Sequence, residues 1–378
     1  MPEPMRILHL ITTTDTGGAE AMLAKLCQAM DRDRFSSRVV SMVHAGPVAR
    51  EIAATGIQVE SLGLDLGKPM PGSVWRLIKI IREFKPQVVQ TWLYHADLMG
   101  LIAARMCSHA RVAWNIRNSN IDFSQYRKLT GWTVKACARF SSFPDAVIAN
   151  SHVGRDFHME LGYAPKRFEV IPNGFDLDRF SRDELQGRRI REELGIDPAA
   201  PVVTMIARQD PMKDHDTLMR AIALVCRVIP DARLILCGDR VDPDNATLYG
   251  LVRDLGIEAN VLLLGRRRDM PEILSATDVS VLSSLGEGFP NVVGEAMACQ
   301  APVVANNVGD VARIMGDTGV LVPGKDAVAM AGALMELLTM DKEKKRLLGI
   351  EARQRIVDMY SMESVVSQYE DFYGSLIA

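Results

Sequence analysis

Short runs of apolar residues recur along almost the whole chain, and stretches with helical spacing of apolar residues separate most of them. Each run has the length and the boundaries of a buried β-strand. The runs predict strands at 6–11, 37–43, 58–62, 86–91, 111–116, 146–150 and 168–171, and a second series at 202–206, 232–237, 261–264, 279–282, 302–305 and 320–322. Strands that alternate with helices in this way indicate α/β domains, in which helices cover both faces of a parallel sheet.

A change in composition separates the two series of strands. After the strand at 168–171, a Pro-Asn-Gly turn leads into a polar, charge-rich stretch that continues to Pro198. Such a change is typical of a domain boundary, and 378 residues are enough for two domains. We therefore expect two doubly wound, Rossmann-like domains, 1–180 and 181–360, that face a central cleft. The terminal helix, at about 361–378, is expected to pack back on the first domain.

Composition and charge exclude several classes of protein. A hydrophobic content of 48% with 24% charged residues is typical of a globular protein that is neither disordered nor membrane-spanning. The first half is slightly basic within a net charge of -3, which is too weak for nucleic-acid binding but suits an anionic lipid surface or acceptor. The six cysteines form no C-x-x-C pair and indicate buried thiols in a reducing compartment. We expect a cytoplasmic protein, with peripheral contact to the membrane left open.

One helical pattern in the first half has two interpretations. Between Ser124 and Phe143, basic residues are interleaved with Trp132, Val134, Cys137 and Phe140. Such a helix could lie on a membrane surface. We favour the alternative, in which an ordinary amphipathic helix packs on the sheet and keeps its charges in water.

The loop after the first strand lies where nucleotide-binding turns occur in doubly wound sheets. It contains Gly17 and Gly18, but G-x-G-x-x-G is absent, which argues against a dinucleotide dehydrogenase. The two glycines either let a ligand approach the backbone or serve a tight turn that needs positive φ. After the strand at 86–91 comes His95, which is either catalytic or a structural residue of a helix start.

Two loops of the second domain suit a diphosphate. Arg208 and Lys213 follow the strand at 202–206, and a guanidinium and an ammonium beside helix N–H groups would bind such an anion. The stretch 284–298 follows another strand and leads into a short helix.

The stretch 284–298 also contains two carboxylates, Glu287 and Glu295. A carboxylate would repel a diphosphate, so its presence there is explained if it accepts hydrogen bonds from hydroxyl groups. A nucleotide sugar has hydroxyl groups both on its ribose and on its sugar ring. The alternative for Glu295 is an acid in the first helical turn, stabilised by the helix dipole. That alternative does not explain Glu287 between Gly286 and Gly288.

The spacing of these acids resembles a known motif. Seven residues, including Gly-Phe-Pro-Asn, separate Glu287 from Glu295, as in the E-x7-E motif of retaining glycosyltransferases with the GT-B fold and of family-4 type. The segment 17–20 is similar to that family's N-terminal glycine loop, and Arg208 with Lys213 is similar to its diphosphate-binding pair. The segments 151–153 and 171–176 are similar to the signature before its linker, so the resemblance covers nearly the whole chain.

The resemblance implies roles for individual residues. Glu287 would contact the donor sugar, Arg208 and Lys213 would neutralise the leaving diphosphate, and His95 would face the anomeric side; these four are the implied catalytic residues. A polar residue often precedes that histidine by two positions in the family, where this chain has Leu93. The implied contacts of the nucleotide-sugar donor are Gly17, Gly18, Arg208, Lys213, Gly265, Arg266, Gly288, Phe289, Pro290, Asn291, Val292 and, for the ribose hydroxyls, Glu295.

The resemblance implies retaining transfer of a sugar from a nucleoside-diphosphate sugar, UDP-sugar being the expected donor. The acceptor would be a glycan or a lipid-linked intermediate of a cell-surface polysaccharide such as lipopolysaccharide or capsule. The resemblance also implies that neither a metal nor a cofactor takes part. No D-x-D motif lies next to a strand end, and we interpret the Asp-Pro-Asp sequence at 242–244 as a turn in a charged loop. Two alternatives stay open: a nucleotide-sugar epimerase with the same fold, and a non-catalytic nucleotide-sugar-binding protein.

Overall fold

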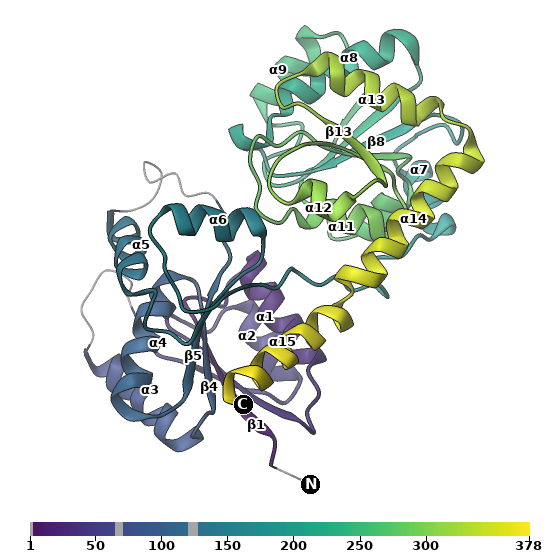
Figure 1. Cartoon of the computed structure of the whole chain (residues 1–378). Coiled ribbons are helices and arrows are strands. Elements are labelled where there is room, and N and C mark those ends of the chain that lie inside the picture. Colours follow the sequence, from purple (N-terminus) through teal and green to yellow (C-terminus); the bar gives the residue numbers. More distant parts are fainter. Residues whose placement is uncertain (1–2, 65–70, 120–127) are drawn as a thin grey trace. The chain divides into compact units, whose positions relative to one another are not determined.

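The computed structural model describes residues 3–64, 71–119 and 128–378, and the chain divides into two compact units (Figure 1). Unit 1 consists of Met1–Gly174 together with Met362–Ala378, and unit 2 of Phe175–Ser361. The chain therefore passes from unit 1 into unit 2 close to the predicted boundary and returns to unit 1 for its last helix.

Unit 1 contains a seven-stranded sheet in the order β3-β2-β1-β4-β5-β6-β7, and every recorded pairing is parallel. Its strands are β1 (Met5–Ile11), β2 (Phe35–Ser41), β3 (Gln58–Ser61), β4 (Val88–Trp92), β5 (Arg111–Ile116), β6 (Ala146–Ala149) and β7 (Phe168–Val170). The second strand starts before the predicted 37–43, because Phe35 is buried and is already paired with Met5. The strand order reverses between β1 and β4, and ligands of such sheets bind beyond the carboxyl ends at this point.

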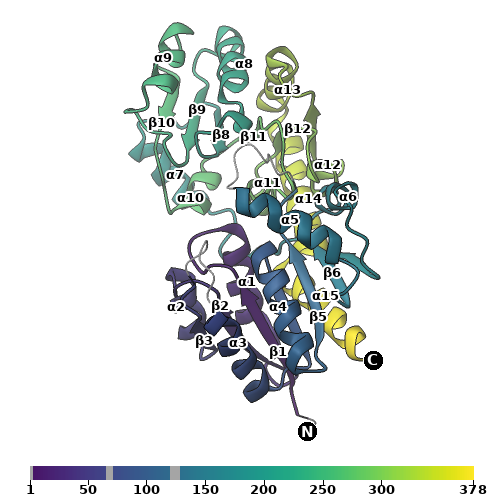
Figure 2. The same cartoon turned by 90° about the vertical axis from the view of Figure 1, so that its left-hand side faces the viewer.

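Helices cover both faces of this sheet (Figure 2). Those of unit 1 are α1 (Gly18–Ala29), α2 (Pro47–Ala54), α3 (Pro71–Phe84), α4 (Tyr94–Cys107), α5 (Lys128–Phe140), α6 (His152–Glu160) and α15 (Met362–Ile377). One core cluster joins α1, α2 and α15 to the sheet, and the other joins α3, α4 and α5 to its opposite face. Tyr369 and Tyr373 of α15 are fully buried in the first cluster, so the end of the chain is part of this core.

Unit 2 contains a six-stranded parallel sheet in the order β10-β9-β8-β11-β12-β13. Its strands are β8 (Val202–Ile206), β9 (Arg233–Cys237), β10 (Val261–Leu263), β11 (Val279–Leu282), β12 (Val303–Asn306) and β13 (Gly319–Val322). Its helices are α7 (Glu184–Glu193), the 3-10 turn η1 (Pro211–Lys213), α8 (His215–Val228), α9 (Ala246–Asp254), α10 (Met270–Ser275), α11 (Asn291–Ala298), α12 (Val311–Met315), α13 (Ala327–Thr339) and α14 (Lys342–Tyr360). Here the strand order reverses between β8 and β11.

The two parallel sheets confirm the predicted α/β class. The apolar runs predicted the strands well because strands of covered parallel sheets are buried on both faces; all four residues of β11 and of β12 are buried. Within the described ranges, no helix is long and apolar enough to cross a membrane.

Candidate functional site

The loops after β8 and β11 lie side by side at the reversal point of the unit 2 sheet. The Leu285 N–H donates to the Met212 carbonyl at 2.8 Å, and the Ser283 hydroxyl donates to the Lys213 carbonyl at 2.7 Å. The Asn306 amide donates to the Ser283 and Ser284 carbonyls at 2.6 and 3.1 Å. These hydrogen bonds join the two loops that the sequence predicts to bind a diphosphate.

Lys213 and Glu287 form an ion pair between these loops. Lys213 Nζ lies 2.5 Å from Glu287 Oε1, and the two side chains are only 21% and 14% exposed. Lys213 ends η1, where its N–H donates to the Asp210 carbonyl, and Asp214 follows with φ 47° as the N-cap of α8. The structure thus brings together two of the four residues implied to be catalytic.

Arg208 lies on the same loop as Lys213 but has a different partner. Its Nε and Nη2 donate to Asp210 Oδ2 at 3.0 and 2.8 Å, and its side chain is 63% exposed. Asp210 also accepts from the Met212 N–H, and that bond, followed by the one from Arg208, lowers the pKa of Asp210. The guanidinium is therefore held at the rim of the loop, where an anion can reach it.

The backbone after Glu287 is fixed by the loop that follows β12. The Asp310 N–H donates to the Gly288 carbonyl at 3.0 Å. Gly309 has φ 58°, and a Cβ there would lie 2.5 Å from the Glu287 carbonyl oxygen. Only glycine combines that backbone conformation with such a close approach. The chain then enters α11 at Asn291, with Pro290 as an N-cap that offers no side-chain cap.

Phe289 and Glu295 differ in what they can offer a ligand. The Phe289 ring is buried between Phe175 and Tyr360, with centroids 6.1 and 5.8 Å away, so it stabilises the core and leaves its backbone for binding. Glu295 is half-buried and lies a full turn beyond Asn291. Because the dipole effect is confined to the first turn, the alternative interpretation of Glu295 as a first-turn acid is wrong.

Gly265 and Arg266 follow β10 at the same edge of the sheet. The Gly238 N–H donates to the Gly265 carbonyl at 2.9 Å, and Arg266 Nε lies 3.0 Å from Asp239 Oδ1. The Asp239 carbonyl in turn accepts from the Gln209 N–H at 2.8 Å, which links this loop to the one that carries Arg208. The predicted donor contacts of unit 2 thus lie in the segments that follow the carboxyl ends of its strands, and Asn291, Val292 and Glu295 lie in the helix α11 that one of these segments enters.

In unit 1, Gly17 and Gly18 lie at the start of α1, and the Glu20 carboxyl lies next to Gly17. Gly17 is the N-cap with φ -165°, and Gly18 is the first helical residue, so the alternative of a turn that needs positive φ is wrong. A Cβ at Gly17 would lie 2.2 Å from Glu20 Oε2, which means that this carboxyl folds back on the start of the helix. Burial raises the pKa of Glu20. Glu20 belongs to the predicted glycine-loop segment 17–20, but the sequence did not predict that its carboxyl lies beside Gly17.

His95 lies in the first turn of α4. Its N-cap, Leu93, has φ 72° and ψ 153°, a conformation that is rare for a branched side chain. His95 is half-buried, and burial lowers its pKa, so the imidazole is neutral around pH 7. Leu93 occupies the position where the family often has a polar residue. Its backbone is strained there, and it is the residue from which α4 begins.

Asp97, two residues beyond His95, is a buried acid that sequence reasoning missed. Its Oδ1 accepts from the Thr91 hydroxyl at 2.5 Å, and its side chain is fully buried. Burial raises the pKa of Asp97 well above its ordinary value, so the carboxyl is protonated at low pH and resists ionisation. An acid in the first turn of a helix is usually interpreted as a dipole partner in water, and no pattern in the sequence signalled burial.

Among residues 3–64, 71–119 and 128–378, no group of three or more His, Cys, Asp or Glu side chains is placed to hold a metal ion. The contacts of the site residues with a donor stay predictions.

Comparisons with known proteins match both halves of the chain. Residues 16–179 match the family model of Glycosyltransferase Family 4, and residues 200–340 match that of Glycosyl transferases group 1. The structure of HepE from Anabaena in complex with UDP is similar to this chain, with a TM-score of 0.83 and 24% sequence identity. The match covers 98% of this chain and 100% of the HepE chain. This likeness supports the GT-B type of α/β fold that the sequence predicted.

Two curated relatives are similar in sequence. N-acetyl-α-D-glucosaminyl L-malate synthase from Bacillus anthracis is 33% identical over 237 residues, which is 62% of this chain and 60% of that protein, so the match covers less than two thirds of the relative. UDP-Gal:α-D-GlcNAc-diphosphoundecaprenol α-1,3-galactosyltransferase from Escherichia coli is 27% identical over 311 residues, 81% of this chain and 79% of that protein.

Proposed function

Because the chain belongs to the glycosyltransferases of group 1 and family 4, we propose that it transfers a sugar from a UDP-sugar to a glycan or lipid-linked acceptor. We propose further that the anomeric configuration is retained and that no metal ion takes part. The observation that carries the proposal is the Lys213–Glu287 pair. In this pair an ammonium group lies beside a carboxylate that can accept hydrogen bonds from hydroxyls, just before the start of α11.

The proposed reaction breaks the bond between the anomeric carbon and the phosphate oxygen, and the electron pair of that bond leaves with the nucleoside diphosphate. The oxygen of the acceptor hydroxyl bonds to the anomeric carbon, and its proton passes to the departing diphosphate. Negative charge then develops on the departing diphosphate. We expect Lys213, the exposed Arg208 and the amino end of α11 to stabilise that charge. Preorganised positive groups of this kind lower the barrier because they need no reorientation as the charge forms.

The remaining residues are assigned by their chemistry. Glu287 is proposed to accept hydrogen bonds from the donor sugar, Glu295 from the ribose, and the backbone at Gly265 and Arg266 to contact the base. In unit 1, His95 is the proposed catalytic residue, and its lowered pKa suits a neutral donor or acceptor of hydrogen bonds.

The relatives support the choice of donor and acceptor. UDP is bound in the HepE structure, and the name of the E. coli relative specifies UDP-galactose as donor and a diphosphoundecaprenol-linked sugar as acceptor. A polyprenol-linked acceptor belongs to the membrane. We therefore propose a role in cell-surface polysaccharide synthesis at the cytoplasmic face of a membrane.

Thermal-shift measurements with UDP-, GDP- and ADP-sugars, followed by transfer and hydrolysis assays on each hit, test the proposal. UDP-sugars are expected to stabilise the chain, and Lys213→Ala and Glu295→Gln to weaken that stabilisation, whereas the exposed Lys342→Ala serves as a control. Unchanged donor affinity and turnover in both site variants would refute the assignment. NMR of the product decides retention, and activity in excess EDTA decides the metal requirement. Release of an altered nucleotide sugar without acceptor would identify an epimerase.

A further inference from the structure

The helices α3, α4 and α5 lie next to one another over one face of the unit 1 sheet (Figure 2). Their buried sides contribute to one core cluster. Their outer sides, with the turn after α5, expose large apolar side chains at Trp75, Ile102, Met106, Trp132, Phe140 and Phe143. We call this surface the α3–α5 face.

Aromatic residues are concentrated on the α3–α5 face. The chain has four tryptophans; Trp92 and Trp114 are fully buried, and both exposed ones, Trp75 and Trp132, lie here at 61% and 73% exposure. On α5, Val134 and Cys137 are buried as the favoured interpretation of this helix expects, but Trp132 points into solvent. Exposed aromatic side chains gathered on one face, rather than scattered singly, mark an interaction surface.

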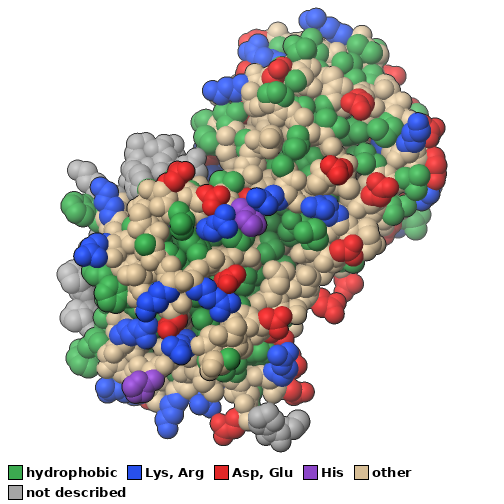
Figure 3. All heavy atoms as spheres, viewed as in Figure 1, with side chains coloured by type: hydrophobic (Ala, Val, Ile, Leu, Met, Phe, Trp, Pro, Cys, Tyr) green, Lys and Arg blue, Asp and Glu red, His purple; other side chains and the backbone are tan. Residues whose placement is uncertain are grey.

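The charges of the same face are almost all positive. Its exposed basic residues are Arg76, Lys79, Arg82, Arg105, Lys135 and Arg139, of which Arg105 is paired with Asp145 at 3.0 Å. Among the described side chains of these three helices, the exposed carboxylate is Glu83, which lies 3.7 Å from Lys79. Figure 3 shows basic and apolar side chains side by side on this flank of unit 1.

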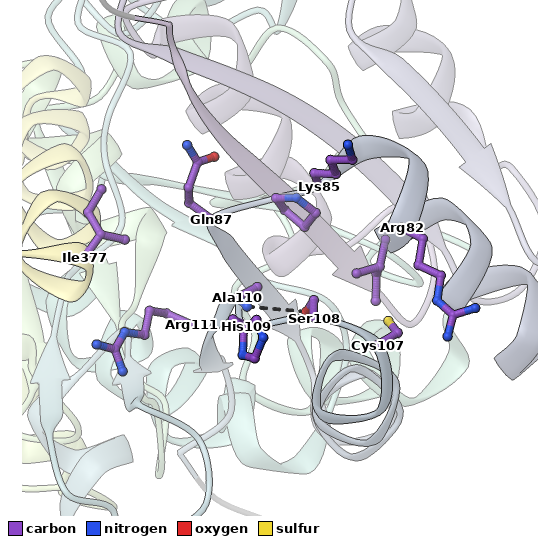
Figure 4. Close-up of a pocket in the computed structure, with 11 residues that line it drawn as sticks. Arg82, Lys85, Gln87, Cys107, Ser108, His109, Ala110, Arg111 and Ile377 are labelled. Carbon is purple, nitrogen blue, oxygen red and sulfur yellow. Dashed lines mark hydrogen bonds between the residues drawn. The ribbon is translucent and has the colours of Figure 1, made fainter.

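The positive charge continues around the ends of α3 and α4. A hollow of about 520 Å³ lies there, before β4 and β5, and Arg82, Lys85, His109 and Arg111 line it (Figure 4). Arg111 is paired with Asp145, whereas Arg82 and Lys85 line the hollow with exposed side chains. Lysine and arginine in such a position can reach phosphates while their apolar stems stay on the protein.

We propose that the α3–α5 face docks on a bilayer that contains anionic lipid. Tryptophan and phenylalanine favour the boundary between headgroups and acyl chains, and surrounding Lys and Arg add attraction to anionic headgroups, so this combination fits a membrane better than a protein partner. The inference rests on the proposed function in one respect: a lipid-linked acceptor would lie in the membrane that the face contacts.

Sedimentation of the full chain with vesicles tests the proposal. Binding is expected to vesicles of phosphatidylcholine mixed with phosphatidylglycerol, to be much weaker with phosphatidylcholine alone, and to fall as salt is added. Lys135→Glu with Arg139→Glu should lower the partition coefficient about 25-fold or more, since each basic residue near an anionic surface contributes roughly a factor of five. Trp132→Ser with Phe140→Ser should lower it by a similar factor.

Matched controls lie on unit 2. Arg227→Glu with Lys342→Glu reverses two exposed charges there, and Leu185→Ser with Val328→Ser removes two exposed apolar side chains; neither pair should change vesicle binding. Equal losses in the control pairs, or no binding to anionic vesicles, would overturn the inference. A wild-type dimer in gel filtration that Trp132→Ser with Phe140→Ser converts to monomer would assign the face to a second copy instead.

Donor affinity keeps the two proposals apart. The α3–α5 face variants are expected to retain their stabilisation by UDP-sugars. Vesicle binding without any donor binding would defeat the proposed function alone, and donor binding without vesicle binding would defeat this inference alone.

Discussion

Lys213 Nζ and Glu287 Oε1 lie 2.5 Å apart in a pair that is mostly shielded from water. Removal of one partner leaves a shielded charge uncompensated, so we expect Lys213→Met and Glu287→Gln each to lower the free energy of unfolding by about 1–3 kcal/mol. The double variant removes both charges and should lose less than the sum of the two. Denaturant unfolding of the four proteins measures this coupling.

The same four proteins separate stability from function. Lys213→Met removes a cation for the diphosphate, and Glu287→Gln removes a carboxylate for the sugar hydroxyls, so each single variant should bind UDP-sugar more weakly. The double variant should also bind it more weakly, because its recovered stability restores neither group. A double variant with wild-type donor affinity would show that the pair is structural only.

Gly309 supports the loop that carries Glu287. Gly309→Ala should lower the free energy of unfolding by more than about 1 kcal/mol, because alanine is strained at φ 58° and its Cβ would lie 2.5 Å from the Glu287 carbonyl oxygen. It should also weaken donor binding. The control is Gly332→Ala, which lies within α13 with open space around it and should be neutral or stabilising by up to about 1 kcal/mol. Similar effects of the two substitutions would contradict this role of Gly309.

The positions of the candidate loops could be predicted from sequence, and several side-chain directions could not. Arg208, Lys213 and Glu287 follow strong apolar runs, and carboxyl ends of parallel strands share one edge of a sheet, so their proximity follows from strand order. That Lys213 pairs with Glu287, while Arg208 turns to Asp210, depends on loop hydrogen bonds between residues far apart in sequence.

Helix register explains other differences. Apolar character alone groups Trp132 with Val134 and Cys137, but only the latter two face the core. A helix of this composition has more apolar residues than its buried stripe can hold, and the sequence does not say which remain outside. Likewise, Glu295 lies one turn into α11 because the helix begins at Asn291.

Asp97 should make stability depend on pH. Its folded-state pKa is raised by burial, so the folded state holds a proton that the unfolded state releases above about pH 4. The contribution of Asp97 is therefore fully present below that pH and is lost as pH rises toward the folded pKa. Asp97→Asn cannot ionise and should lose less stability over this range. Melting temperatures of the two proteins from pH 4 upward measure the difference, and parallel curves would contradict it.

His95 should control turnover without controlling donor affinity. The imidazole is neutral at pH 7 because burial lowers its pKa below the ordinary 6.5, so the wild-type enzyme should keep its activity down to pH values below 6.5.

His95→Gln retains hydrogen-bonding capacity but cannot titrate. We expect kcat to fall about 10²-fold or more, and the decline of kcat at acidic pH to disappear. His109→Gln, at an exposed histidine outside the candidate site, is the matched control and should leave kcat unchanged. Profiles of kcat against pH for the three proteins, with UDP-sugar affinity measured beside them, check this. An acid limb that persists in His95→Gln would assign that titration to another group, and unchanged turnover would make His95 a structural residue of the helix start.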